Sequence, residues 1–330
     1  MPLQRKRQSS YSDTQTIEEA PQAVPEPVEP PPGPRVTAII VAYNQASQLR
    51  RCLDALGRSQ DRQTLEILVM DNGSFDETRM IDADYPEVTI LRLPKNFGRV
   101  RAMNILTRTA KAELLFFLDP RIEVQPDTVS RLAAALEENE QAAAVCPLII
   151  AENGAPVEAF FRLPDTSAFA RVWSTGEGLL PQPIDAAGGL QKVEYATFEA
   201  MLITKYFVRG LNYLDDRYGE YWADAEVSWQ IRRAGRSILV MPSVRVVRHA
   251  VGASPRSTAA RAALAVDCGG GASSFVSKHS GFLSGLLLRL RFALSALGSA
   301  LILREPGYNL SRFAGLLSGS KIDGNQSAIL

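Results

Sequence analysis

Five short groups of polar residues follow one another in a fixed order, and several stand directly after an apolar run. They are VAYN at 41–44, DNGS at 71–74, NFG at 96–98, LDPR at 118–121, and WAD at 222–224 leading into HAVGAS at 249–254. The apolar runs indicate strands, and open α/β sheets bind ligands beyond the carboxyl ends of their strands. These groups are therefore the candidate ligand-binding residues.

Asp71 directly follows an apolar run and opens the DNGS group. A carboxylate at this point can accept the paired donors of a uracil-like ring edge, or a ribose hydroxyl. Asp, Asn and Gly are also the usual residues of an Asx-turn, so a structural role is open as well.

Asn96 and Gly98 precede an expected helix whose first turn carries Arg99 and Arg101. Backbone N–H groups and cations at a helix start can bind a diphosphate. The alternative is a capped, solvated helix start with no ligand.

Asp119 ends another apolar run, where a carboxylate can hold Mg²⁺ or Mn²⁺ against a nucleotide diphosphate. Arg121 stands two residues later. A guanidinium cannot ligate a metal ion, but it can neutralise phosphate charge directly. Asp119 is therefore the candidate metal ligand, and the need for a divalent cation is open.

Asp224 lies at the start of an amphipathic helix, where the positive end of the helix dipole favours an ionised carboxylate. Such a carboxylate can take a proton from an acceptor hydroxyl. Plain N-capping is the alternative, and Glu226 is the next candidate base. His249 ends a strand candidate and can donate to a phosphate, or it has a structural role.

Apolar periodicity predicts alternating strands and helices, and hence βαβ units around a mostly parallel, Rossmann-like sheet. The periodicity fades from Cys146 to about Tyr195, which predicts a partly irregular segment. The CGGGA sequence at 268–272 is interpreted as a flexible loop, because it lacks the strand-to-helix context of a dinucleotide fingerprint. The expected strands are 36–42, 65–70, 88–93, 114–118, 200–204, 237–240 and 244–247, and the expected helices are 49–56, 98–111, 126–138 and 224–234.

Composition limits the class of protein. Lys plus Arg and Asp plus Glu both number 36, so no bulk charge favours nucleic acid. Three scattered cysteines and two histidines indicate a reducing compartment and no structural zinc. Residues 1–34 lack the apolar core of a secretory signal, and their Pro-rich, acidic end predicts a disordered tail. We therefore expect a cytoplasmic protein.

Residues 281–303 are apolar but contain Arg289 and Arg291. Two arginines near the centre make a membrane-spanning helix costly. An interfacial helix fits better, with these arginines and Arg304 available to anionic head groups at the inner face of the cytoplasmic membrane. The alternative is a helix that caps the domain or meets a second subunit.

Over roughly residues 35–254 the ordered set of motifs resembles family 2 of the glycosyltransferases, particularly its rhamnosyltransferase-like branch. The resemblance rests on VAYN, DNGSFDET, NFG with Asn104, FFLDP, and LDDRYGEYWADAEVSWQIRRAG with the downstream HAVGAS. It implies a GT-A fold over 35–260, followed by a helical C-terminal segment at 261–330. It also implies transfer, with inversion, from a nucleotide-diphosphate sugar to a glycan or lipid-linked acceptor, as in polysaccharide synthesis for the bacterial cell envelope.

Carried over by position, the resemblance implies a role for each candidate. Asp224 is the general base, Asp119 belongs to the metal region, and His249 lies near the diphosphate. Tyr43, Asn44 and Asp71 line the nucleoside, and Asn96 and Gly98 line the donor cleft. Arg121 is not carried over from the family; it is expected to join donor binding through its positive charge.

The sequence departs from the family pattern at two positions. An acid normally stands where Arg121 is, and the Glu-Asp pair expected before the helix is Ala223-Asp224. These departures keep open a second hypothesis, a catalytically weakened relative that binds a glycan, a nucleotide or a partner.

Overall fold

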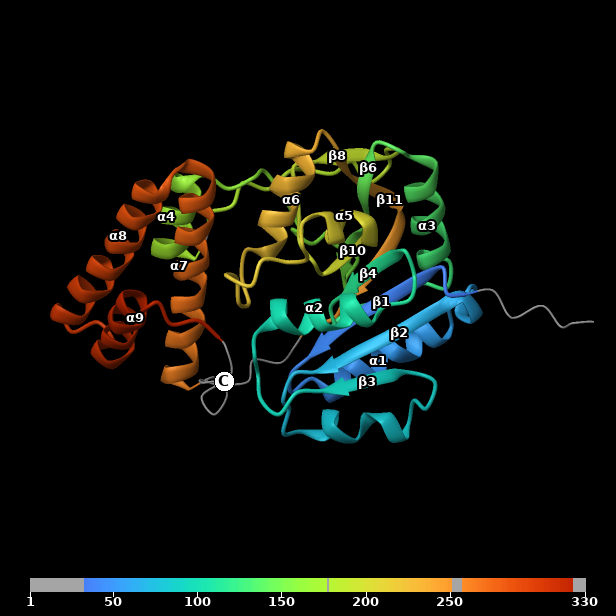
Figure 1. Ribbon diagram of the computed structural model, residues 1–330, viewed down its shortest axis with the longest axis horizontal. Helices are drawn as coiled ribbons and strands as arrows, with labels where there is room; N and C mark the ends of the chain where they lie inside the picture. The colour runs from blue at the N-terminus through green and yellow to red at the C-terminus, as the bar shows by residue number, and fades with distance from the viewer. Residues whose placement is uncertain (1–32, 177, 251–256, 323–330) are drawn as a thin grey trace, which may run out of the picture. The chain divides into compact units, whose positions relative to one another are not determined.

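The computed structural model describes residues 33–176, 178–250 and 257–322. Residues 1–32 of the predicted tail and residues 251–254 of the HAVGAS group lie outside this part of the chain. Within it, a nine-stranded sheet has the order β3-β2-β1-β4-β10-β6-β11-β5, and β8 also pairs with β11 (Figure 1). Its strands are β1 (Val36–Ala42), β2 (Leu65–Asp71), β3 (Thr89–Arg92), β4 (Leu114–Leu118), β5 (Ile122–Glu123), β6 (Ala142–Ala151), β8 (Gln191–Val193), β10 (Ala200–Thr204) and β11 (Ser237–Arg248).

The first four strands of the sheet order, β3, β2, β1 and β4, run parallel, as the sequence predicts. β6 and β11 also pair in parallel, and β10 lies antiparallel between β4 and β6. The register sets Ala42 opposite Asp71 and Ile40 opposite Leu118, so the chain leaves β1, β2 and β4 at one edge of the sheet. Because β10 is antiparallel, it begins at this same edge, with Ala200 opposite Leu118.

The helices that connect these strands form where apolar residues recur every three to four positions. α1 (Ala46–Gly57) buries Leu49, Leu53 and Leu56 and ends at the predicted glycine. Further helices between strands of the large sheet are α2 (Arg99–Thr109), α3 (Thr128–Glu138), α5 (Lys205–Gly210) and α6 (Ala223–Arg233). Two short 3₁₀ helices, η1 (Arg62–Thr64) and η2 (Glu77–Ala83), stand before β2 and β3.

The expectation of an irregular segment between Cys146 and Tyr195 is partly wrong. β6 spans ten residues, and its alanines and Pro147 hide it from a periodicity test although most of the strand is buried. A helix, α4 (Thr166–Thr175), follows a two-residue strand, β7 (Phe160–Phe161), which pairs with β9 (Tyr195–Ala196). Asp165 accepts the Ala168 N–H at 2.7 Å and thereby caps α4.

β11 corrects a second expectation. Residues 237–240 and 244–247 belong to one strand and not two, and its pairing with β6 shifts register between Met241 and Arg245. The strand ends at Arg248, at the edge where β1, β2 and β4 end, because β11 pairs with β5 directly after the Asp119 turn.

Three helices, α7 (Thr258–Ser280), α8 (Phe282–Leu301) and α9 (Pro306–Ser318), pack on one another, and α4 contacts α7 and α8 (Figure 1). α7 begins shortly before the predicted boundary at 260/261 and contains the CGGGA sequence, so the loop predicted there is wrong. The glycines serve packing: a Cβ on Gly269 would lie 2.7 Å from the Trp173 ring, and one on Gly271 would lie 2.9 Å from Trp222.

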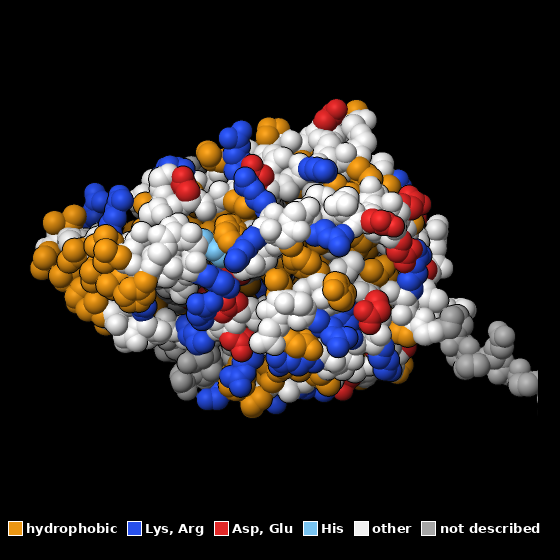
Figure 2. Space-filling view, turned by 45° about the horizontal axis from the view of Figure 1, so that its top comes forward, with side chains coloured by type: hydrophobic (Ala, Val, Ile, Leu, Met, Phe, Trp, Pro, Cys, Tyr) orange, Lys and Arg blue, Asp and Glu red, His pale blue; other side chains and the backbone are white. Residues whose placement is uncertain are grey.

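α8 has two unlike faces. The buried face packs on α7 and α9 and consists of Gly285, Leu288, Phe292, Ala293, Ala296 and Ala300. The opposite face carries exposed leucines, Leu283, Leu286, Leu287, Leu290, Leu294 and Leu301. Figure 2 shows apolar side chains gathered at the left end of the view, where α8 lies. α8 has the length and apolar composition to cross a membrane, but its packed face gives it a place within this fold.

Candidate functional site

Two loops are tied together at the carboxyl edge of β1 and β2. Asp71 accepts the Ser74 N–H at 2.8 Å, so the structural Asx-turn is present. Asn44 donates its backbone N–H to the Ser74 hydroxyl at 2.9 Å and accepts the Phe75 N–H at 2.9 Å through its side chain. Tyr43 meets Phe75 edge to face, and Phe75 is 68% exposed. The Phe75 ring is therefore open to solvent, while Asp71 is buried.

Asn96 is buried and organises the next loop. Its side-chain oxygen accepts the Asn72 amide and the Gly98 N–H, each at 2.9 Å. Asn72 in turn accepts the Phe97 N–H. Sequence reasoning missed Asn72, although it stands inside the DNGS group.

The first turn of α2 differs from the expectation. The Arg99 N–H donates to the Glu220 carboxylate at 3.1 Å, and the Val100 N–H donates to the Gly219 carbonyl at 3.2 Å. A Cβ on Gly98 would lie 2.8 Å from the Ile322 carbonyl oxygen. The protein itself satisfies these N–H groups, so a diphosphate could bind them only after these contacts break, and that role stays a prediction.

A cluster of arginines and carboxylates stands just beyond β4. Arg121 bonds both oxygens of Asp119, at 2.8 Å and 3.1 Å, and the Arg121 N–H adds a third bond at 3.0 Å. Arg121 also bonds Glu199 at 3.0 Å, and Arg248 bonds both oxygens of Glu199 at 3.2 Å. Burial alone would raise the pKa of Asp119, but Arg121 and the nearby charge of Arg99 lower it. Asp119 is therefore an ionised partner of guanidinium groups.

The short segment Phe198-Glu199 joins this cluster to Asp224. The Phe198 N–H donates to the Asp224 carboxylate, and the Phe198 carbonyl accepts the Arg99 guanidinium at 3.2 Å. The Glu199 carbonyl accepts the Asp119 N–H at 2.9 Å. Arg99 is thus near enough to both Asp119 and Asp224 to affect the pKa of each.

Asp224 is held but does not cap α6. The N-cap residue is Trp222, which makes no side-chain cap bond. Asp224 accepts the Ala225 N–H at 2.9 Å and the Tyr195 hydroxyl. Burial raises the pKa of Asp224 above its ordinary value, although Arg99 and these donors favour the ionised form. Desolvation therefore opposes the ionised form that the helix start is expected to favour.

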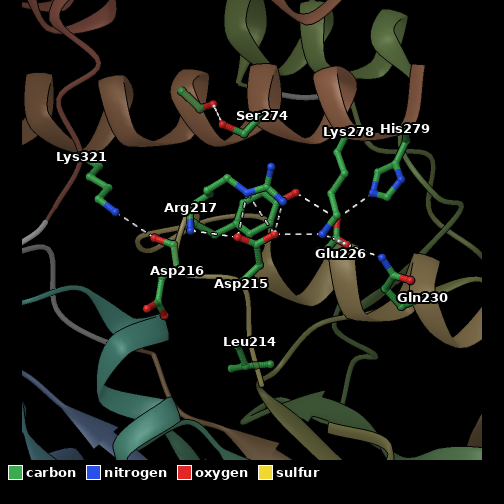
Figure 3. A network of polar contacts seen from close by, with 12 residues as sticks. Leu214, Asp215, Asp216, Arg217, Glu226, Gln230, Ser274, Lys278, His279 and Lys321 are labelled. Atoms are coloured by element: carbon green, nitrogen blue, oxygen red, sulfur yellow. Dashed lines mark hydrogen bonds and ion pairs between the residues drawn. The ribbon is translucent and has the colours of Figure 1, made fainter. Parts of the chain in front are cut away.

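Glu226 does not face this cluster and is no alternative base. Its carboxylate bonds the Tyr218 hydroxyl at 3.0 Å, Gln230 at 2.7 Å, and Lys278 and His279 of α7 at 2.7 Å and 2.6 Å (Figure 3). These contacts fasten α6 to α7.

His249 also departs from the expectation. One ring nitrogen lies 2.7 Å from Glu123 and the other 2.6 Å from Glu152, so both are occupied by carboxylates. His249 could donate to a phosphate only after leaving one of these carboxylates, and that role stays a prediction. Arg248, its neighbour, is the cation that reaches the cluster.

A divalent cation needs free carboxylate oxygens. Those of Asp119 accept hydrogen bonds from Arg121, and Glu199 is shared by two arginines. In the described ranges no group of three or more His, Cys, Asp or Glu could hold a metal ion. The residues present therefore do not fit Mg²⁺ or Mn²⁺ at Asp119, and the candidate metal assignment is corrected.

A separate hollow of about 740 Å³ lies between α5 and α6, lined partly by Tyr206, Phe207 and Arg233. α5 follows the far end of β10, where Lys205 bonds the Glu113 carbonyl just before β4 begins. The hollow is therefore at the opposite edge of the sheet from the charged cluster.

Comparison with known proteins agrees with this architecture. Residues 37–173 match the family described as glycosyl transferase family 2. An N-acetylglucosaminyltransferase of Mesorhizobium japonicum is 28% identical over 145 residues, which are 41% of this chain and 34% of that protein. An uncharacterized glycosyltransferase, YfnE, of Bacillus subtilis is 31% identical over 118 residues, 34% of this chain and 30% of that protein. The matches thus span about a third of each relative.

Among solved structures, GalNAc-T7 with UDP, GalNAc and Mn²⁺ superposes with a TM-score of 0.53 at 19% identity. The superposition covers 66% of this chain and 44% of that one. It supports a GT-A fold, as expected from the sequence.

Proposed function

Because residues 37–173 match glycosyl transferase family 2, we propose that this chain transfers a sugar from a nucleotide-diphosphate donor to a glycan or lipid-linked acceptor. The supporting observation is that the segment Phe198-Glu199 contacts both parts of the site: Phe198 bonds Arg99 and Asp224, and Glu199 bonds Arg121 and the Asp119 N–H. A cluster able to hold donor phosphates and a buried carboxylate able to take a proton are thereby neighbours at the ligand-binding edge of the sheet.

The donor lies across this edge. Its nucleoside is bound at the loops of Tyr43, Asn44, Asp71 and Asn96, and the exposed ring of Phe75 offers a surface for stacking on the base. Asp71 and Asp119 follow strands on either side of β1, about 10 Å apart at the usual strand spacing. A nucleoside bound beside Asp71 would direct its diphosphate toward Arg121, which bonds Asp119.

Asp224 is the general base of a single displacement. The acceptor hydroxyl gives its proton to the Asp224 carboxylate while its oxygen bonds to the anomeric carbon, and the bond from that carbon to the diphosphate breaks. Attack opposite the leaving group inverts the configuration. A pKa raised by burial strengthens this carboxylate as a proton acceptor, provided that it remains ionised.

The relatives named N-acetylglucosaminyltransferases make N-acetylhexosamine donors the first to test, beside the rhamnosyl donors that the sequence motifs suggest. Polysaccharide synthesis for the bacterial cell envelope is the process we propose.

The exposed leucines of α8 suit an acceptor that resides in a membrane. We place this face against the inner surface of the cytoplasmic membrane, with Arg291 and Arg304, both exposed, near anionic head groups. Arg289 is not available for this role, because it donates to the Leu316 carbonyl of α9 at 2.6 Å.

A second function, binding without turnover, is favoured by one specific observation. Arg121 stands where the family resemblance implies a second acid, and it bonds both oxygens of Asp119; this pairing can mark a site that no longer transfers sugar.

Turnover separates the two functions. The purified full chain is incubated with UDP-N-acetylglucosamine, UDP-N-acetylgalactosamine, GDP-mannose and dTDP-rhamnose, and released nucleoside diphosphate is measured with and without lipid-linked acceptors. Release from one donor class that increases with acceptor supports transfer. Binding of a nucleoside diphosphate without any release favours the second function, and neither binding nor release contradicts both.

A further inference from the structure

The carboxylate beyond β4 is engaged by the protein itself. The two parallel bonds from Arg121 to Asp119 are the strongest geometry that a guanidinium and a carboxylate can adopt. A metal ion could reach Asp119 only after Arg121 had moved away. That would leave Arg121 without its main partner in a half-buried position.

Glu199, the second acid of the cluster, is engaged as well. Arg121 and Arg248 both bond its carboxylate, at 3.0 Å and 3.2 Å. Asp119 and Glu199 therefore fix the positions of guanidinium groups, and they offer a cation no pair of free oxygens.

The arginines keep donors to spare. In the part of the chain that the structure describes, the Nη1 group of Arg121 and the Nε and Nη2 groups of Arg248 bond to no residue. Arg99 uses Nη2 on the Phe198 carbonyl and likewise keeps Nε and Nη1. The side chains of Arg121 and Arg248 are 31% and 34% exposed, so solvent and ligands can reach them.

The cluster keeps N–H donors for an anion. Three guanidinium groups lie beside Asp119, Glu199 and Asp224, so the charges balance when Asp224 is ionised, and an anion would bind the N–H groups that these acids do not use. Guanidinium groups match phosphate oxygens in planar, paired hydrogen bonds.

From these contacts we infer that Arg121, Arg248 and Arg99 bind the donor's diphosphate directly, in place of a divalent cation. This inference rests on the proposed function, and it concerns how that function is achieved. The protein supplies fixed guanidinium groups for the diphosphate, whereas the solved GT-A neighbour was crystallised with Mn²⁺.

The test is isothermal titration of the full chain with UDP, GDP and dTDP, once in EDTA and once in Mn²⁺. We expect at least one nucleoside diphosphate to bind with a dissociation constant that differs by less than about threefold between the two buffers. Arg121→Gln and Arg248→Gln should each weaken that binding in EDTA by about tenfold or more, the range expected for a lost charged contact.

Arg245→Gln is the matched control for Arg248, because Arg245 is exposed on the same strand, three residues earlier. It should bind like the wild type. Circular dichroism of each variant checks that the fold is intact.

Other outcomes overturn the inference in distinguishable ways. Binding that requires Mn²⁺ contradicts direct recognition by arginine but leaves the proposed transfer standing. If a nucleoside diphosphate binds in EDTA and neither Arg121→Gln nor Arg248→Gln weakens that binding, the assignment of these arginines to the diphosphate is wrong, but the proposed transfer stands. If no nucleoside diphosphate binds in either buffer, the proposed function fails and the inference fails with it.

Discussion

Arg121 bonds both carboxylate oxygens of Asp119, two residues before it in the chain. The contact is local, yet it decides the chemistry of the site. A carboxylate at the end of a central strand is a natural cation ligand, and here it serves to orient a guanidinium.

Exchanging this guanidinium for a carboxylate should change the ligand that Asp119 accepts. Arg121→Asp removes the partner of Asp119 and creates two neighbouring acids, so affinity for a nucleoside diphosphate should fall in EDTA and be restored in part by Mn²⁺. Titration with increasing Mn²⁺ measures this response. Equal weak binding at every Mn²⁺ concentration would show that Asp119 cannot be converted into a cation site by this change.

The contacts of Glu226 predict how stability depends on pH. Burial would raise its pKa, but Gln230, Lys278 and His279 lower it below the ordinary 4.5. The stabilisation is therefore fully present above the unfolded pKa and is lost as the pH falls through the lower folded value. Glu226→Gln should lower the free energy of unfolding by roughly 3 kcal/mol at pH 7, the usual cost of removing one charge from a buried pair.

Urea unfolding at pH 7 and at pH 3 measures this difference, which should shrink at the lower pH. Glu138→Gln, on the exposed surface of α3, is the control and should change little at either pH. A loss that is the same at both pH values would mean that shape, and not charge, links α6 to α7.

Three adjacent glycines of α7 provide an internal comparison. Trp173 stacks on Phe292 with ring centroids 4.6 Å apart and lies under Arg312, so its ring cannot easily yield to a new methyl group at Gly269. Gly269→Ala should cost about 1–3 kcal/mol by overpacking. Gly270→Ala, which meets nothing within 4 Å, should stabilise the helix by up to about 1 kcal/mol. Thermal unfolding of both variants measures the two effects. If Gly269→Ala is more stable than the wild type, the tight contact between Gly269 and Trp173 is contradicted.

Membrane contact through α8 should depend on both leucine and arginine. Leu287→Ser with Leu294→Ser, or Arg291→Glu with Arg304→Glu, should reduce flotation with liposomes that contain anionic lipid, and high salt should reduce it too. Arg51→Glu, a charge reversal of the same kind at one exposed residue of α1, is the control. If the wild-type chain does not float, or if no variant alters flotation, α8 is not a lipid-binding face.

How much of the structure the sequence could predict depends on how local the signal is. The apolar runs of β1, β2 and β4 predict buried parallel strands, and the structure confirms them. β6 was not predicted, because a strand that is buried on both faces can contain alanine and proline and shows no alternation of apolar and polar residues. The glycines of α7 suggested a loop because the sequence does not show why a helix needs glycine there. Two of them make room for the indole rings of Trp173 and Trp222, which are distant in the sequence.

The candidate site follows the same rule. Asp71, Asp119 and Asp224 were identified because each stands at a strand or helix end. Glu199, Arg248 and Tyr195 were missed, because they reach the site only through pairing of strands far apart in sequence. The partners of His249 and Glu226 are equally remote, and they give both side chains contacts that the sequence does not predict.

The central claim is that Asp224 takes the proton of the acceptor hydroxyl. Asp224→Asn keeps the size of the side chain and its bond to the Ala225 N–H, so the fold and nucleoside diphosphate binding should persist. The most direct measurement is the rate of sugar transfer by this variant with the donor and acceptor that the wild type uses, compared with Asp185→Asn in an exposed turn as control. The account predicts a fall of about a hundredfold or more for Asp224→Asn, the scale of general-base catalysis, and no change for the control. Transfer by Asp224→Asn at close to the wild-type rate would contradict it.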